Sequence, residues 1–418
     1  MFGFGNKQAK RRQGPRGSFD LPLLLAALAL ATLGVIMVTS SSIAVADGSH
    51  QGAFYYLKRH LVFLVLGGCL AAAAMRTELK VLEKHSFLLL LFGVIMLLMV
   101  FLPVFGMRIN GARRWVNLLV TSFQPVEAVK LILVGYLSSY LVRHREGVEY
   151  DLFGVVKPVG VAGLIVLLLL AQPDFGSAAL VVATTVGMVW LAGARMRNLL
   201  VLATPLVPAL IYAATAEDYR IKRLTSFLDP WKDPFNDGFQ LTQSLMAIGR
   251  GEWTGVGLGQ SVLKLSYLPE AHTDFIFAVI SEELGLAGIL CVMGLFTLVV
   301  WRGLSMGIKG VDVGQRFAGY VAFGISLMIG LQTMVSIGVN LGALPTKGLT
   351  LPLISYGGSS IVLTCAMAGV LLRATYEINR ALDARQMATR MPATAVPDAK
   401  AATAGAAVAT PVREAVGA

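Results

Sequence analysis

The sequence contains little charge. Of its 418 residues, 14% are Asp, Glu, Lys or Arg, whereas 56% are hydrophobic. Soluble globular domains carry about 25% charged residues. The composition therefore excludes an ordinary soluble protein and indicates a chain that lies largely in a lipid bilayer.

Cysteine is also scarce, and several familiar motifs are missing. Cys69, Cys291 and Cys365 all fall within apolar runs, which predicts small core side chains and argues against disulfides or a cysteine metal site. The glycines of 255–259 lack the strand–turn–helix setting of a phosphate-binding loop. No small-residue cleavage pattern follows the first apolar run, so we do not expect a cleavable signal peptide.

Apolar runs long enough to cross a bilayer recur along most of the chain. They predict ten transmembrane helices, near residues 20–43, 58–75, 86–106, 125–142, 157–172, 174–193, 198–215, 275–301, 317–341 and 359–379. Gln172-Pro173-Asp174 indicates either a very tight turn between two of them or one long broken helix. The predicted fold is an all-α polytopic membrane protein. A basic tail (1–19) precedes the transmembrane domain (20–380), and a disordered tail (381–418) follows it.

Positive charge is distributed unevenly among the connections. Ten crossings place both termini on one side of the membrane, and most Lys and Arg residues outside the longest connection fall in the two tails and the short connections on that side. This side is therefore predicted to be the cytoplasm. The net charge of +11 then reflects membrane anchoring rather than nucleic-acid binding.

The longest connection, 216–274, lies on the predicted outer side between the seventh and eighth helices. It is far longer than the usual connection, and such segments are either functional or disordered. Its Trp, Phe, Tyr and Leu residues argue against disorder. We expect a partner or the substrate to order it.

Asp274 ends this connection directly against the next apolar run and is the strongest candidate for chemistry. A carboxylate at the water–lipid boundary, with cations nearby, can act as a general base. The alternative is that Asp274 only caps the helix that follows, since Asp is a preferred N-cap residue. His272 titrates near neutrality and is a rival base. Its position favours a role in supporting the connection.

Glu282 and Glu283 lie inside the same predicted helix, about 12–14 Å deeper than Asp274. Acids within a membrane helix usually face a protein interior or a cavity. Adjacent residues point in different directions, so the two cannot both share the face of Asp274. We expect a buried ion pair with a cation of a neighbouring helix, and a structural or coupling role.

Two further polar clusters are predicted on the outer side. The first contains Arg113 and Arg114, whose planar guanidinium groups suit pyrophosphate oxygens, and a helix start at Phe123-Gln124-Pro125. Glu127 and Lys130 are three residues apart, so pairing along the helix explains both better than ligand binding does.

The second cluster spans 344–360 and includes Lys347 and Ser355. Its proline and glycine content breaks any helix, yet the segment is apolar enough to dip into the membrane. Such backbone is stable at that depth only against protein or a wet cavity. Lys347 is predicted to face the same side as Asp274.

Together these sequence segments resemble those of the SEDS family (shape, elongation, division and sporulation). Its members are polytopic bacterial peptidoglycan polymerases. The resemblance covers residues 20–380 and rests on six segments: Asn110–Trp115, Phe123–Lys130, Gln172–Ala178, Phe227–Gln240, Tyr267–Gly285 and Leu344–Ser360. The amino-acid sequences of 267–274 and 348–352 resemble the division branch of the family rather than the elongation branch.

The resemblance implies an enzyme that polymerises lipid II at the outer face of the bacterial cytoplasmic membrane during septal cell-wall synthesis. The essential aspartate of the family falls on Asp274. The family also implies a divalent cation, Mg²⁺ or Mn²⁺, held mainly by substrate phosphates. The basic residues expected to share the charge of the pyrophosphate are Arg113, Arg114, Arg220, Arg223 and Lys347.

The resemblance further implies partners, because a polymerase joins no peptides. They are an FtsI-like class B penicillin-binding protein transpeptidase and other divisome membrane proteins. The alternative function is a lipid II flippase, which Glu127, Glu282 and Glu283 would suit. A flippase requires a polar path to both faces, whereas the distinctive motifs gather on the outer face. This favours the polymerase.

Overall fold

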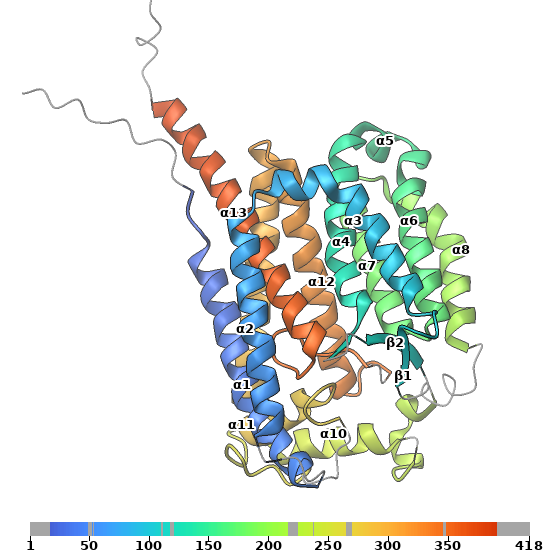
Figure 1. Ribbon diagram of the computed structural model, residues 1–418, viewed down its shortest axis with the longest axis vertical. Coiled ribbons are helices and arrows are strands. Elements are labelled where there is room, and N and C mark those ends of the chain that lie inside the picture. Colours follow the sequence, from blue (N-terminus) through green and yellow to red (C-terminus); the bar gives the residue numbers. More distant parts are fainter. Residues whose placement is uncertain are drawn as a thin grey trace, which may run out of the picture.

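The long helices of this chain form one bundle whose connections gather at its two ends (Figure 1). In the computed structural model, the residues that can be described are 17–48, 52, 54–109, 112–117, 121–215, 225–236, 238–264, 270–345 and 348–390. The start of α1 and the end of α13 lie at one end of the bundle. The small sheet, α10 and the connection between α12 and α13 lie at the other (Figure 1).

Each predicted apolar run coincides with a long helix. These helices are α1 (Leu21–Gly48), α2 (Tyr55–Arg76), α3 (Leu79–Met99), α4 (Pro125–Arg143), α6 (Leu152–Ala171), α7 (Phe175–Leu191), α8 (Met196–Thr215), α11 (Ile276–Asp312), α12 (Arg316–Asn340) and α13 (Gly358–Arg390). Among the described residues, eight helices are long and apolar enough to cross a membrane, and α7 is a shorter apolar helix. The chain is therefore a multi-pass membrane protein, while the number of crossings stays a prediction.

The short elements lie in the connections. The helix α5 (Arg145–Tyr150) joins α4 to α6, whereas the 3-10 helix η1 (Pro230–Lys232) and α10 (Phe239–Arg250) precede α11. Three antiparallel strands follow α3 in the order β1 (Gly106–Ile109), β2 (Ala112–Asn117) and β3 (Ser122–Phe123). Among the described residues, this small sheet is the only departure from an all-helical fold.

Three predicted boundaries were wrong. The helix predicted for 86–106 lies at Leu79–Met99, because the residues that follow turn into β1. The helix α11 does not end near residue 301 but continues to Asp312. In this extension, Arg302 forms an ion pair with Asp20, which precedes α1 (2.5 Å). The helix α13 continues to Arg390, so 381–390 is not a disordered tail. Ala, Leu, Arg, Gln and Met in that stretch are good helix formers outside the membrane as well.

The turn between α6 and α7 consists of Gln172, Pro173 and Asp174, as one of the two alternatives predicted. Asp174 ends the turn by accepting a hydrogen bond from the N–H of Ser177 (3.2 Å). The side chain of Gln172 donates to the carbonyl of Leu97 (2.9 Å) and so joins the turn to α3. Two separate helices result.

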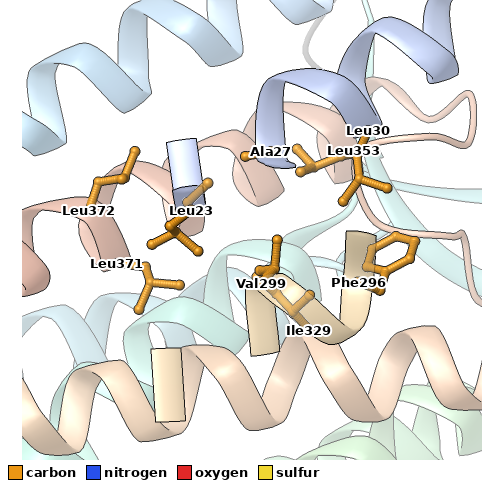
Figure 2. A pocket seen from close by; sticks show the side chains of 10 residues that line it. Leu23, Ala27, Leu30, Phe296, Val299, Ile329, Leu353, Leu371 and Leu372 are labelled. Atoms are coloured by element: carbon orange, nitrogen blue, oxygen red, sulfur yellow. The ribbon is translucent and has the colours of Figure 1, made fainter. Parts of the chain in front are cut away.

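The helix α12 is the centre of the bundle and packs against α4, α7, α11 and α13. A small cavity between α1, α11, α12 and α13 is lined only by apolar side chains, such as Leu23, Phe296 and Ile329 (Figure 2). Its walls offer no group for acid–base chemistry.

Candidate active site

Asp274 lies in the turn before α11, at the end of the bundle that carries α10. The helix begins at Ile276 with Phe275 as its N-cap residue, so Asp274 lies one residue before the cap. The side chain of Asp274 is half-buried. Its Oδ2 atom faces Gly348, where an added Cβ would lie 3.2 Å from this oxygen. The absence of a side chain at Gly348 therefore leaves room beside the carboxylate.

The main chain around Asp274 is held by two other segments. Asn340, the last residue of α12, donates from Nδ2 to the carbonyl of Asp274 (3.0 Å). The hydroxyl of Ser355 donates to the carbonyl of Thr273 (2.7 Å), and it accepts from the N–H of Leu351 (2.7 Å). The end of α12 and the segment before α13 thus fix the position of this turn.

His272 lies in an aromatic cluster rather than beside Asp274 as a second base. Its ring centroid is 4.8 Å from that of Tyr56 and 5.5 Å from that of Tyr356. Burial lowers the pKa of His272 below its usual value of 6.5, with an opposing effect from Glu270. The N–H of Tyr356 also donates to the carbonyl of His272 (2.9 Å). These contacts suit a residue that supports the turn.

Arg113 and Arg114 lie on β2 and have different surroundings. Arg114 donates to the carbonyl of Gln172 (3.2 Å) and to that of Pro173, and its Nη1 lies 4.0 Å from Asp174 Oδ1. Its guanidinium group therefore stabilises the turn between α6 and α7. Nε of Arg113 is buried, with no hydrogen-bond partner among the described residues.

The other predicted cations, Arg220, Arg223 and Lys347, lie outside the described residues. The turn that Arg114 stabilises does reach the segment around Gly348. An added Cβ on Gly176 would lie 3.3 Å from the Leu349 side chain. The start of α7, which follows this turn, therefore lies against Leu349, the neighbour in sequence of the residue that faces Asp274.

Glu127 and Lys130 form the pair that their spacing predicts. Nζ of Lys130, which is fully buried, lies 2.9 Å from the Glu127 carboxylate. It also donates to Oε1 of Gln332 (2.9 Å), whose Nε2 donates to the carbonyl of Thr350 (2.9 Å). Through Gln332, the pair also supports the segment that faces Asp274.

Glu282 and Glu283 are fully buried and both form ion pairs. Oε1 of Glu282 lies 3.2 Å from Nη1 of Arg250, and its carboxylate also accepts from the hydroxyl of Ser261. Oε1 of Glu283 lies 2.8 Å from Nζ of Lys264. The expected ion pairs therefore exist. As expected, the cation of Glu282 lies on a neighbouring helix, since Arg250 is the last residue of α10, whereas Lys264 lies in the connection that follows α10.

This connection also supplies hydrogen bonds on both sides of a break in α11. Gly285 has non-helical backbone angles (φ 62°, ψ −159°). On either side of it, the N–H of Val256 donates to the carbonyl of Glu282 (3.0 Å), and the N–H of Leu286 donates to that of Glu252 (2.9 Å). Backbone groups that lose their helical partners are thereby satisfied. The described part of the connection is thus bonded to α11, while the ordering of the whole segment by a partner or the substrate stays a prediction.

Sequence reasoning missed Asn340, Gln332, Ser261 and Lys264. Two of them carried a usable signal, because Gln332 and Asn340 fall within a predicted membrane helix, where polar side chains are costly and usually have a role. Ser261 and Lys264 carried none, since polar residues are ordinary in a long connection.

The arrangement provides a half-exposed carboxylate, that of Asp274, eight and nine residues before the buried, ion-paired acids Glu282 and Glu283. Such a group can accept a proton from a bound hydroxyl. Among the residues the structure describes, no cluster of three or more His, Cys, Asp or Glu side chains could hold a metal ion.

Comparison with known proteins shows which family the chain matches. Residues 21–380 match the family described as "Cell cycle protein", FtsW/RodA/SpoVE. The chain is 53% identical to the probable peptidoglycan glycosyltransferase FtsW of Xanthomonas oryzae pv. oryzae, over 90% of this chain and 76% of that protein. It is 46% identical to the protein of the same name from Coxiella burnetii, over 86% of this chain and 97% of the relative.

Solved structures with a similar fold support the same family. One chain, from a study of a peptidoglycan synthase complex that coordinates polymerisation and crosslinking, is 29% identical with a TM-score of 0.69, covering 86% of this chain and 98% of that one. The rod shape determining protein RodA of Thermus thermophilus is 28% identical with a TM-score of 0.62, covering 86% and 97%. The chain studied here belongs to the FtsW/RodA/SpoVE family of cell cycle proteins.

Proposed function

We propose that Asp274 is the general base with which this chain, an FtsW-like peptidoglycan glycosyltransferase of cell division, joins lipid II molecules into glycan strands. One observation carries the assignment. Asp274 is half-exposed and faces Gly348, whereas Glu127, Glu282 and Glu283 are buried in ion pairs. Of these four acids, Asp274 is the one that a substrate hydroxyl can approach.

The proposed chemistry is an inverting transfer. The 4-hydroxyl of the acceptor GlcNAc attacks C1 of the donor MurNAc, and the bond from C1 to undecaprenyl pyrophosphate breaks. The carboxylate of Asp274 takes the proton of the attacking hydroxyl, which requires an oxygen within hydrogen-bond reach. Cations stabilise the charge that develops on the leaving pyrophosphate.

The cations assigned to this role are Arg113, Arg220, Arg223 and Lys347. Arg114 has a weaker claim than the sequence suggested, because its guanidinium group is bonded to the turn between α6 and α7. A divalent cation, Mg²⁺ or Mn²⁺, is also proposed. Such an ion would be carried mainly by the substrate phosphates.

The proposed partner is an FtsI-like class B penicillin-binding protein, within a divisome at the septum. Support comes from the structural neighbour, whose study describes a peptidoglycan synthase complex that combines polymerisation with crosslinking. We expect weak polymerisation by the chain alone and a clear increase in the complex. Both termini are proposed to be cytoplasmic, with the Asp274 turn on the outer side.

The flippase alternative loses its main support. The acids that would have lined a transport path, Glu127, Glu282 and Glu283, are each bonded to a cation of the protein. Their contacts explain them as structural groups.

The test is polymerisation of labelled lipid II by purified Asp274→Asn protein, analysed on gels with and without the transpeptidase. Loss of a general base costs about 10²–10⁴ in rate, so we expect no detectable polymer from a folded protein. Asp151→Asn is the matched control, because Asp151 accepts a backbone hydrogen bond at the start of α6 and is exposed.

Polymerisation by Asp274→Asn near the wild-type rate would rule out this mechanism. A variant that polymerises supplied lipid II normally, but no longer exposes lipid II on the outer leaflet, would instead indicate a flippase.

A further inference from the structure

Asn340 is a fully buried amide at the end of α12 whose side chain makes three hydrogen bonds. Nδ2 donates to the carbonyl of Asp274 (3.0 Å) and to that of Ser336 (2.8 Å), and Oδ1 accepts from the N–H of Ala278 (3.1 Å). Both amide protons and the amide oxygen are therefore used. Because the bond to Ser336 lies within α12, it fixes the amide plane on its own helix.

The two remaining bonds cross to α11 and bracket its beginning. Asp274 lies before the helix, and Ala278 lies in its first turn, where its N–H is shared between Asn340 Oδ1 and the carbonyl of Phe275 (3.1 Å). One amide thus bonds to both sides of the residue pair Phe275-Ile276, at which the chain changes from turn to helix. This bridge determines the angle at which the Asp274 turn joins α11.

Asn340 also relates the carboxylate to the group in front of it. The chain that leaves α12 at Asn340 returns to the site at Gly348, which faces Oδ2 of Asp274. Asn340 therefore holds Asp274 and is also the residue at which the segment opposite Asp274 begins.

The helix α10 reaches the same point. The hydroxyl of Ser244, which is fully buried on α10, donates to the backbone carbonyl of Asn340 (2.8 Å). At its other end α10 contributes Arg250, which pairs with Glu282 of α11. The contacts of α10 thus include both the first half of α11 and the residue that holds Asp274.

We propose that Asn340 is a positioning residue that places the Asp274 carboxylate where it accepts the proton of the attacking hydroxyl. The inference rests on the proposed role of Asp274 and deepens it. Asn340 itself does not touch the reacting atoms. Misplacement of a reacting group by about 1 Å can cost 10²-fold in rate, so loss of the bridge is expected to reduce kcat.

The test compares Asn340→Asp, Asn340→Ala and wild type in the full chain bound to its transpeptidase, with lipid II as the substrate. Asn340→Asp keeps the size and the oxygen that accepts from Ala278, but as a carboxylate it loses both donors. We expect kcat to fall by about 10- to 10²-fold while KM for lipid II changes little. Thermal unfolding measures the structural part of the effect separately.

Asn379→Asp is the matched control. Nδ2 of Asn379 on α13 donates to the carbonyl of Ser18 (2.8 Å), so the same kind of bond is lost at the opposite end of the bundle. We expect wild-type kcat from this variant. If Asn340→Ala does not fold, Asn340→Asp and Ser244→Ala decide the question, and both are expected to lower kcat.

Two results would overturn the proposal: wild-type kcat per folded molecule in Asn340→Asp, or a change confined to KM. Asp274→Asn, measured beside them, separates the two proposals. If it is inactive while Asn340→Asp is normal, the base stands and the positioning role fails. If Asp274→Asn is active, the assignment of the base itself fails.

Discussion

Asp274 and the adjacent acids Glu282 and Glu283 lie close together in the sequence, yet their surroundings differ completely. Asp274 lies in a turn, half-exposed, with the bare backbone of Gly348 in front of its carboxylate. Glu282 and Glu283 have no exposed surface, and each is bonded to a cation and a hydroxyl. The comparison shows that surroundings, rather than residue type, separate a candidate base from structural acids.

The two environments follow from where each acid lies relative to the break at Gly285. The connection before α11 covers the end of the half-helix Ile276–Leu284, and it brings Arg250, Ser261 and Lys264 against the two glutamates. At the start of that half-helix, Asn340 and Ser355 bond to main-chain carbonyls of the turn before it. The half-helix is thus enclosed along its length, whereas the turn before it, with residues 272–274, is half-exposed.

The largest effect on stability is expected from breaking the enclosed pair. Lys264→Met leaves the Glu283 carboxylate buried without its cation, and removal of one partner of a buried ion pair costs about 3–5 kcal/mol in the free energy of unfolding. Thermal unfolding in detergent measures it. Lys309→Met is the control, since Lys309 is exposed on the same helix. The comparison fails if both variants unfold like wild type.

A smaller effect, on rate alone, is expected at the turn that carries Asp274. In Gly348→Ala the new methyl group would lie 3.2 Å from Oδ2 of Asp274, so the carboxylate must move by a few tenths of an ångström. We expect kcat for lipid II to fall by less than about 10²-fold, with unchanged thermal stability. Gly160→Ala is the control, because nothing lies within 4 Å of its added Cβ. A wild-type kcat would show that the space before Asp274 is not needed.

The smallest effect is expected from His272→Asn and appears as a change in pH dependence. Burial lowers the pKa of His272 from 6.5, so unfolding takes up a proton when the pH lies between the lowered pKa and 6.5. The neutral ring therefore contributes stability above pH 6.5 that is lost as the pH falls through this window. His272→Asn should flatten this decline, measured by thermal unfolding from neutral to mildly acidic pH.

The exposed ring of His85 provides the control in His85→Asn, which should keep the wild-type pH dependence. His272→Asn should also retain far more polymerase activity than Asp274→Asn. Equal losses in the two variants would make His272 a true rival as the base.

Local patterns predicted most of the fold. Hydrophobic runs located the long helices, the breakers Gln172-Pro173-Asp174 located a turn, and the spacing of Glu127 and Lys130 predicted their pair. The break at Gly285 could not be predicted, because it depends on hydrogen bonds from residues about thirty positions earlier, a distance at which periodicity carries no information. The strands after α3 were missed for a similar reason, since strands this short have no distinct pattern.

The candidate site was only partly predictable. The position of Asp274 at the end of a polar connection identified it as a candidate, and its resemblance to a family motif strengthened the choice. The residues that hold it, Asn340 and Ser355, come from other parts of the chain, and their partners are main-chain carbonyls. A carbonyl is present at every position, so sequence alone gives no sign of which one is used.

The interruption of α11 at Gly285 also makes the helical phases of its two parts independent. Each residue advances a helix by about 100°, so in a continuous helix an insertion would rotate everything beyond it. Here the part before Gly285 is held in register by Val256, whereas the part after it is held by Glu252 and Trp253. An insertion in the second part, beyond the residues bonded to 252–253, would therefore turn the rest of that part without turning the segment that carries Asp274.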